Sequence, residues 1–190
     1  MIDPTALSQA NLGGLVLAGG EGTRLEDYVR QLRGESLPKQ YVNFIGTRSM
    51  LQHTFDRAER LIPRRKILTV VTKHHLAPEV CRQLADRAPG SVIVQPENKD
   101  TGPGILLPLT YLHKRCPEAT LAVFPSDHFI LEEDRFIDHV RLEARAVHHD
   151  PSQIVLLLWK PSGQKQATVT WFPPITTAII AAVARQRQLR

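Results

Sequence analysis

A short apolar run that leads directly into a glycine-rich turn most constrains how this 190-residue chain can fold. Leu15–Ala18 is typical of a buried strand, and three glycines follow within Gly19–Arg24. Glycine has no Cβ atom, so the backbone can approach a ligand closely, and a strand–loop–helix junction points N–H groups at that ligand. An ordinary tight turn is the alternative. The charges of Arg24 and Lys39 favour a phosphate group as the ligand.

Strand-like and helix-like segments alternate along the rest of the chain. Further strands are expected at Lys66–Val71, Ser91–Val94, Thr120–Phe124 and Ile154–Leu158. Helices are expected after Ser49 as far as Ile62, over Leu76–Ala88, after Gln95–Gly104, and over Glu132–His148. This alternation indicates βαβ units, so we expect an α/β fold with a Rossmann-like, mostly parallel sheet and flanking helices.

The composition argues against several classes of protein. With 42% hydrophobic and 23% charged residues the chain has ordinary globular usage. The net charge of +5 suits anionic ligands, but no basic stripe with interleaved aromatic residues indicates nucleic acid as a partner. Cys81 and Cys116 lack the spacing of a disulfide framework or a zinc site. The apolar run Ile175–Ala184 is too short to span a membrane, so we expect no membrane partner and a cytoplasmic location.

Two more polar segments follow predicted strands. Gln95–Gly104 leads into a helix, and Pro125–His128 follows the strand at Thr120–Phe124. By composition alone each could be a capped connection, with Asp127 as a helix cap. In open parallel sheets, however, ligands bind beyond the carboxyl ends of the strands, where a carboxylate can hold Mg²⁺ against phosphates. The adjacent pairs His74–His75 and His148–His149 have no acidic residue at ligand spacing, so we expect them to be exposed polar residues.

The three segments together resemble the motifs of a known enzyme family. Neither Gly-x-x-x-x-Gly-Lys-Ser/Thr nor Gly-x-Gly-x-x-Gly is present. Leu17–Leu25 followed by Pro38–Tyr41 resembles the signature of sugar-1-phosphate nucleotidyltransferases, and Lys-Gln-aromatic is most similar to the mannose-1-phosphate guanylyltransferases. Gln95–Pro103 and Pro125–His128 resemble the second and third motifs in the family order. The resemblance implies synthesis of GDP-mannose and pyrophosphate from GTP and mannose 1-phosphate, with Mg²⁺ as the cofactor.

Two alternatives to this function remain open. One is a related transferase for another sugar or nucleotide, and the other is a nucleotide-binding module without catalysis. The resemblance implies Arg24 and Lys39 as catalytic contacts to phosphate and Asp127 as the catalytic metal ligand. The nucleotide-binding residues that it implies are Leu17, Ala18, Gly19, Gly20, Gly22, Thr23, Arg24, Lys39, Gln95, Asn98 and Thr101, with Glu97 and Lys99 as charged neighbours.

The likeness runs from Gly14 to Leu158 and then stops. We therefore expect residues 1–158 to form a partial nucleotidyltransferase domain, incomplete at its C-terminal side, and residues 159–190 to be a poorly ordered tail outside the family pattern. With suitable codons, a shifted reading frame from Trp159 encodes a family-like segment, which favours a frame change after Leu158. The residues expected to contact the sugar phosphate are then missing, so we expect nucleotide binding with little or no transferase activity. The oligomeric state stays open.

Overall fold

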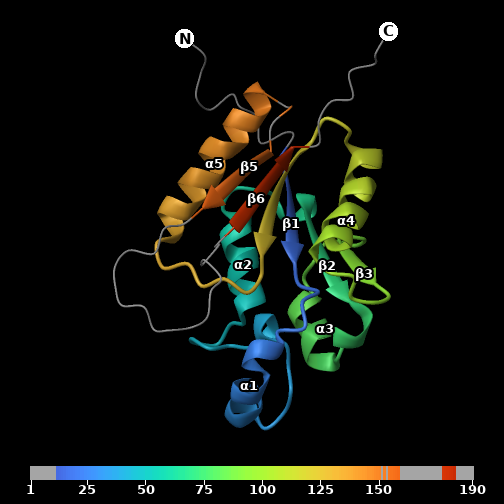
Figure 1. Ribbon diagram of the computed structural model, residues 1–190, viewed down its shortest axis with the longest axis vertical. Coiled ribbons are helices and arrows are strands. Elements are labelled where there is room, and N and C mark those ends of the chain that lie inside the picture. Colours follow the sequence, from blue (N-terminus) through green and yellow to red (C-terminus); the bar gives the residue numbers. More distant parts are fainter. Residues whose placement is uncertain (1–11, 151, 153, 159–176, 183–190) are drawn as a thin grey trace.

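The structure is a computed structural model that describes residues 12–150, 152, 154–158 and 177–182 (Figure 1). Its sheet has six strands in the order β3-β2-β1-β4-β6-β5. The strands are β1 (Leu12–Leu17), β2 (Ile67–Thr72), β3 (Val92–Gln95), β4 (Thr120–Pro125), β5 (Ile154–Leu158) and β6 (Thr177–Ala182). The pairs β1–β2, β1–β4 and β2–β3 are parallel, so the predicted α/β fold with a mostly parallel sheet is confirmed.

Five α-helices connect and flank these strands. They are α1 (Glu26–Arg33), α2 (Met50–Glu59), α3 (Pro78–Leu84), α4 (Thr101–Arg115) and α5 (Glu133–His149), with short 3-10 turns at η1 (Thr23–Leu25), η2 (Lys39–Tyr41), η3 (Arg64–Lys66) and η4 (Lys73–His75). Ser49 caps α2 as predicted, because its hydroxyl accepts from the Gln52 backbone while the Gln52 side chain accepts from the Ser49 backbone. In the described part of the chain no helix combines the length and apolar character needed to cross a membrane.

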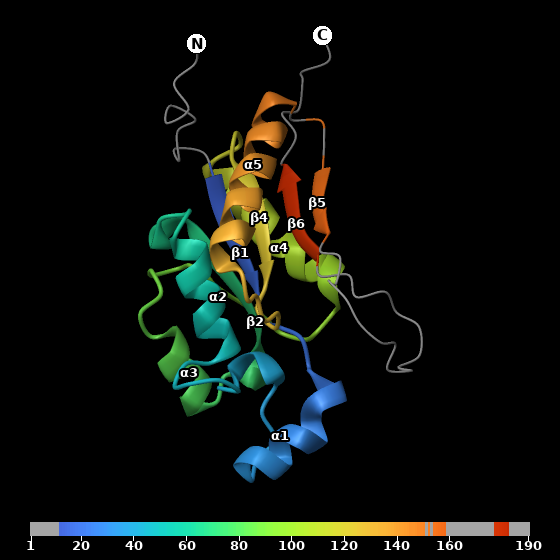
Figure 2. The ribbon, with the colours of Figure 1, turned by 90° about the vertical axis from the view of Figure 1, so that its left-hand side faces the viewer.

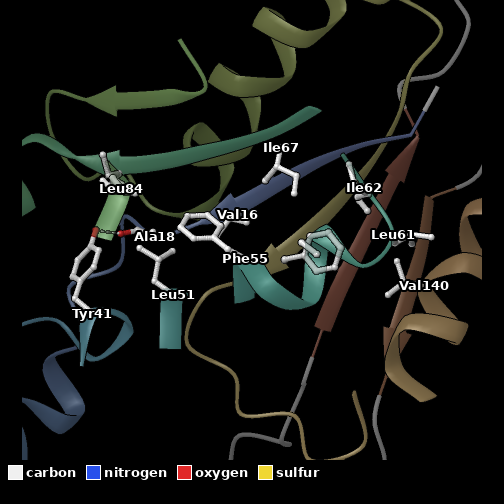
Figure 3. Packing of buried hydrophobic residues seen from close by; sticks show 14 of the residues in the cluster. Val16, Ala18, Tyr41, Leu51, Phe55, Leu61, Ile62, Ile67, Leu84 and Val140 are labelled. Atoms are coloured by element: carbon white, nitrogen blue, oxygen red, sulfur yellow. Dashed lines mark hydrogen bonds between the residues drawn. The ribbon is translucent and has the colours of Figure 1, made fainter. Parts of the chain in front are cut away.

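The helices cover both faces of the sheet. Figure 2 shows α2, α3 and α5 on one side and α4 on the other. The first side contains the larger core, in which Val16 of β1 packs with Phe55 of α2 and Val140 of α5 (Figure 3). On the second side, Leu109 of α4 packs against the opposite face of the sheet, and Pro108 is buried within the same helix. The β1 backbone is therefore enclosed from both sides, which gives the loop after it a rigid support.

The strand β6 departs from the predicted layout. Thr177–Ala182 lies within the segment expected to be a poorly ordered tail, yet it pairs antiparallel with both β4 and β5. Figure 1 shows it in red between the yellow β4 and the orange β5. The edge of β4 is thus paired, since an apolar segment with β-branched residues can bond to the unpaired backbone groups of such an edge. The rest of the predicted tail, 159–176 and 183–190, lies outside the described residues.

Candidate functional site

A cleft of about 640 Å³ lies at the carboxyl ends of the parallel strands. In Figure 1 the arrowheads of β1 and β4 point down into this region, towards α1. Among the sequence-predicted residues, those that line the cleft are Leu17, Gly19, Gly20, Gly22, Thr23, Arg24, Lys39, Gln95, Asn98, Thr101 and Asp127. The fold thus brings residues from three separate sequence segments to one place. The volume falls in the range of small-molecule sites.

Ala18 is the one predicted contact that does not line this cleft. It is fully buried beneath the glycine loop, and its carbonyl oxygen accepts hydrogen bonds from Gln40 Nε2 at 3.1 Å and from the Tyr41 hydroxyl at 2.7 Å (Figure 3). Burial raises the pKa of Tyr41, so the phenol stays protonated as a donor. Ala18 therefore joins the start of the loop to η2 and anchors it from below.

The glycine loop is held in place through its backbone carbonyl groups. Gln40 Nε2 also donates to the carbonyl oxygen of Gly20 at 2.7 Å, and the Thr72 hydroxyl donates to that of Gly19 at 2.9 Å. At Gly22 the φ angle is +67°, and a Cβ atom there would lie 3.0 Å from the Lys39 backbone nitrogen. Only glycine combines that conformation with so close an approach. The sequence therefore places glycine where the loop passes against the segment that carries Lys39.

Lys39 and Asp127 meet in the cleft. The ammonium Nζ lies 2.7 Å from Asp127 Oδ2, and His128 Nε2 lies 3.6 Å from Asp127 Oδ1. Both side chains of the Lys39–Asp127 pair are about three-tenths exposed, so a ligand in the cleft can reach them. Burial lowers the pKa of His128, and the nearby Lys39 adds to this effect while Asp127 opposes it. The imidazole is then neutral near neutral pH, and Lys39 is the charged partner of Asp127 that the described residues supply.

Asp127 fits a magnesium ligand by its chemistry. Mg²⁺ favours hard oxygen donors and usually takes one or two protein carboxylates together with phosphate oxygens and water. The Asp127 carboxylate follows β4 directly and faces a cleft that also contains the glycine loop. Its pairing with Lys39 means that it already compensates a positive charge at this position.

The second predicted segment reaches the cleft through the predicted contacts Gln95, Asn98 and Thr101, and also through Asp100 and Gly104. Gln95 is buried at the end of β3, and Thr101 begins α4. The Asn98 side chain accepts from the Asp100 backbone at 3.0 Å and donates to Glu21 Oε1 at 3.2 Å. Asn98 thereby joins this segment to the glycine loop. Glu97 and Lys99, expected as charged neighbours, form an exposed ion pair with each other and do not line the cleft.

Sequence reasoning missed two buried polar residues that line the cleft and hold backbone carbonyl groups in place. Gln40 and Ser126 are buried; Gln40 holds two loop carbonyl groups and the Ser126 hydroxyl donates to the carbonyl oxygen of Leu17. A buried polar side chain needs such a partner. The sequence could have indicated both residues, since Gln40 is adjacent to Lys39 and Ser126 is adjacent to Asp127.

The expectation that His74 and His75 are exposed polar residues holds for His74 but is corrected for His75. His75 is only 4% exposed, and Nε2 atoms of both rings lie at hydrogen-bonding distance from Glu21 Oε2. The acidic partner comes from the glycine loop, 53 positions before His74, so no local spacing could reveal it. The turn η4 differs from an α-helix, which is why adjacent residues can face the same group.

Known proteins are similar to this chain in sequence and in fold. The family model described as "Nucleotidyl transferase" matches residues 13–163. The chain belongs to this family. The match confirms the predicted family, and it extends slightly past both ends of the predicted likeness. The nucleotidyltransferase fold thus accounts for the parallel strands and their helices.

Curated relatives of this nucleotidyltransferase chain are longer than it is. It is 32% identical over 150 residues to the xanthan biosynthesis protein XanB of Xanthomonas campestris pv. campestris, a match that covers 78% of this chain and 31% of XanB. It is 30% identical over 138 residues to a mannose-1-phosphate guanylyltransferase of Escherichia coli strain K12, covering 71% of this chain and 28% of that protein. The chain therefore spans about a third of the length of the relatives that it matches.

A solved structure agrees with the fold. The crystal structure described as a mannose-1-phosphate geranyltransferase from Thermus thermophilus matches with a TM-score of 0.67 at 26% identity. That match covers 80% of this chain and 42% of the other. The nucleotidyltransferase architecture is thus supported by both sequence and structure.

Proposed function

We propose that this chain supplies the nucleotide-binding part of an enzyme that makes GDP-mannose and pyrophosphate from GTP and mannose 1-phosphate. The convergence of three sequence segments on one cleft at the carboxyl ends of β1, β3 and β4 carries this proposal. Relatives named mannose-1-phosphate guanylyltransferase, at about 30% identity, support the choice of nucleotide and sugar.

The reaction that we propose needs no covalent bond to the protein. An oxygen of the sugar phosphate attacks the α-phosphorus of GTP, a new P–O bond forms, and the bond from the α-phosphorus to the bridging oxygen breaks with release of pyrophosphate. Two anions must meet in line, so positioning and neutralisation of charge account for the rate. These are tasks for cations and N–H groups.

The residues of the cleft suit those tasks. Arg24 and Lys39 would neutralise the phosphates, and the backbone N–H groups of the loop from Gly19 to Thr23 would bind their oxygens. Gln95, Asn98 and Thr101 would contact the rest of the nucleotide. Asp127 would hold Mg²⁺, which when bound supplies further positive charge to the phosphates. Lys39 would have to leave Asp127 in order to contact a phosphate.

Calorimetric titration with nucleotides tests this proposal. GTP, ATP and CTP are each titrated into the protein with and without Mg²⁺, and single-stranded RNA serves as the comparison anion. Binding of GTP in preference to the other ligands, and stronger with Mg²⁺, is the expected result. Preference for ATP or CTP would favour a related transferase, and binding of RNA alone would overturn the proposal. In a chain that continues after Leu158 with the family-like segment, release of pyrophosphate with mannose 1-phosphate then separates an enzyme from a binding module.

A further inference from the structure

Three side chains that the proposed reaction does not use converge at the rim of the cleft. The Glu21 side chain projects from the glycine loop, and His74 and His75 lie in η4 directly after β2. Glu21 Oε2 is 3.0 Å from His74 Nε2 and 3.3 Å from His75 Nε2. The ligand atoms of all three residues lie within 4.8 Å of one another. We refer to them as the Glu21–His74–His75 cluster.

The separations match those between the ligands of a tetrahedral metal ion. Zinc binds imidazole nitrogen and carboxylate oxygen at about 2.0–2.2 Å, which places neighbouring ligands of a tetrahedron about 3.3–3.6 Å apart. The two distances from Glu21 Oε2 are within a few tenths of an ångström of that spacing, and the two ring nitrogens lie within 4.8 Å of each other. The rings of His74 and His75 are 4.3 Å apart between centroids and inclined at 67°, so both present Nε2 to the same oxygen.

The charge states of the cluster suit a cation. Burial lowers the pKa of His75 in spite of the neighbouring Glu21 carboxylate, which favours the neutral imidazole that a metal requires. Burial by itself would raise the pKa of Glu21, but hydrogen bonds from His74, His75 and Asn98 outweigh it and the net shift is downward. Glu21 is therefore ionised near neutral pH. A cation that replaced the two histidine hydrogen bonds would meet one negative charge and, with each ring protonated on Nδ1 instead of Nε2, two lone pairs.

The surroundings also orient the carboxylate. Asn98 Nδ2 donates to Glu21 Oε1 at 3.2 Å, which leaves Oε2 directed at the two rings. Outer hydrogen bonds of this kind commonly fix the ligands of metal sites. His74 is half exposed, so an ion and a water molecule in the fourth position can enter from solvent.

We propose that the Glu21–His74–His75 cluster is a binding site for a divalent transition metal such as Zn²⁺, separate from the magnesium site proposed at Asp127. Two imidazoles and one carboxylate favour Zn²⁺, Ni²⁺ or Co²⁺ over Mg²⁺, which prefers oxygen ligands only. A bound ion would join the glycine loop to η4 and so fix the loop at the rim of the nucleotide cleft.

Titration of the metal-free protein with Zn²⁺ in the absence of nucleotide tests this site. Variants Glu21→Gln and His74→Ala each remove one ligand, and His75→Ala removes the buried one. The matched control is the double variant His148→Ala/His149→Ala, since this adjacent pair at the end of α5 is exposed and belongs to no such cluster among the described residues. Replacement of Zn²⁺ by Co²⁺ adds the visible absorption spectrum of a tetrahedral site as a second readout.

We expect one Zn²⁺ per chain, with affinity at least about 100-fold lower in the Glu21→Gln and His74→Ala variants, since even outer-shell partners are commonly worth 10–100-fold. The control should bind as the unaltered protein does. If His75→Ala fails to fold, the other two variants still decide the question. The proposal is overturned if Zn²⁺ does not bind, or if Glu21→Gln and His74→Ala bind it as tightly as the unaltered protein does. Because no nucleotide is present, neither outcome depends on the proposed transferase function.

Discussion

Lys39 Nζ and Asp127 Oδ2 lie 2.7 Å apart in the cleft, so the cation proposed for phosphate and the carboxylate proposed for magnesium neutralise each other. Binding of a magnesium nucleotide would exchange this one pair for two, because Lys39 would turn to a phosphate and Asp127 to the metal. The charge of the pair is compensated both before and after binding. Without a ligand, Lys39 and Asp127 therefore stabilise each other as an ion pair. Replacing either residue tests its proposed contact with phosphate or with Mg²⁺.

Replacing Lys39 by methionine should weaken GTP binding while keeping the apolar stem of the side chain. A charge-assisted hydrogen bond contributes about 1.5–3 kcal/mol, so the dissociation constant should rise by roughly 10- to 150-fold. The Mg²⁺ affinity of the nucleotide-free protein should rise at the same time, because Asp127 loses its cation. Calorimetry measures both values. Lys114→Met, at the far end of α4, is the matched control, and unchanged GTP affinity in Lys39→Met would refute the phosphate contact.

Replacing Asp127 by asparagine should remove most of the Mg²⁺ dependence of GTP binding. The amide keeps the shape but loses the charge that a hard cation needs. In the absence of Mg²⁺ the variant should bind GTP at least as well as the unaltered protein does, because Lys39 is released. Asp138→Asn on α5 is the control, since Asp138 is paired on the surface with Arg141. The same Mg²⁺ dependence in both variants would leave Asp127 as the ion-pair partner of Lys39 only.

Replacing Gly22 by alanine should disturb the cleft, and Gly34 provides a matched control. Both glycines have positive φ angles, +67° and +78°, so alanine at either position costs about 1–2 kcal/mol in backbone conformation. Only at Gly22 does the new Cβ atom meet backbone, at 3.0 Å from the Lys39 nitrogen. Thermal unfolding should therefore show a loss of stability in both variants that is larger for Gly22→Ala, and GTP titration should show weaker binding in Gly22→Ala alone. Equal binding by both variants would contradict this.

Replacing Glu59 by glutamine should destabilise the fold in a pH-dependent way. Glu59 accepts hydrogen bonds from Arg64 at 2.9 Å and from the nearly buried Arg87 at 2.7 Å. Burial by itself raises the pKa of Glu59, but these hydrogen bonds outweigh it and hold the pKa below the ordinary value of 4.5. The carboxylate therefore stabilises the fold fully above that value, and the stabilisation is lost as the pH falls through the lowered pKa.

We expect Glu59→Gln to lower the free energy of unfolding by about 1–3 kcal/mol at pH 7, since it removes a charged partner of Arg87. The difference in the free energy of unfolding between the variant and the unaltered protein should disappear well below about pH 4, where the unaltered side chain is neutral as well. Denaturant unfolding at a series of pH values gives both numbers. Glu35→Gln, at an exposed position, should stay within about 0.5 kcal/mol throughout. A gap that is independent of pH would mean that shape and not charge is responsible.

The parts of the fold that sequence predicts are those set by local pattern. Ser49 carries its capping signal within four residues, and the apolar runs that became β1, β2 and β4 are long enough to be recognised. Most of the cleft residues were found because they lie in motifs at the end of a strand or just after it, whereas Lys39 was found by its own motif in η2. Contacts between distant segments were not predicted. His75 contacts a glutamate from another loop, and Gln40 donates to carbonyl groups of the loop after β1. Their partners cannot be inferred from neighbours in the chain.

The position of β6 bears on the order in which the chain can fold as it is synthesised. β5 is made before β6, but in the described sheet its strand neighbour is β6, and β6 lies between β5 and β4. A ribosome that has released Leu158 has therefore produced β5 without the strand that joins it to the sheet. Domains can begin to fold during synthesis, and here the part up to β4 can do so early. The outer third of the sheet has to wait until Thr177–Ala182 emerges, and Ile154 and Leu156 remain unpaired apolar strand residues in the interval.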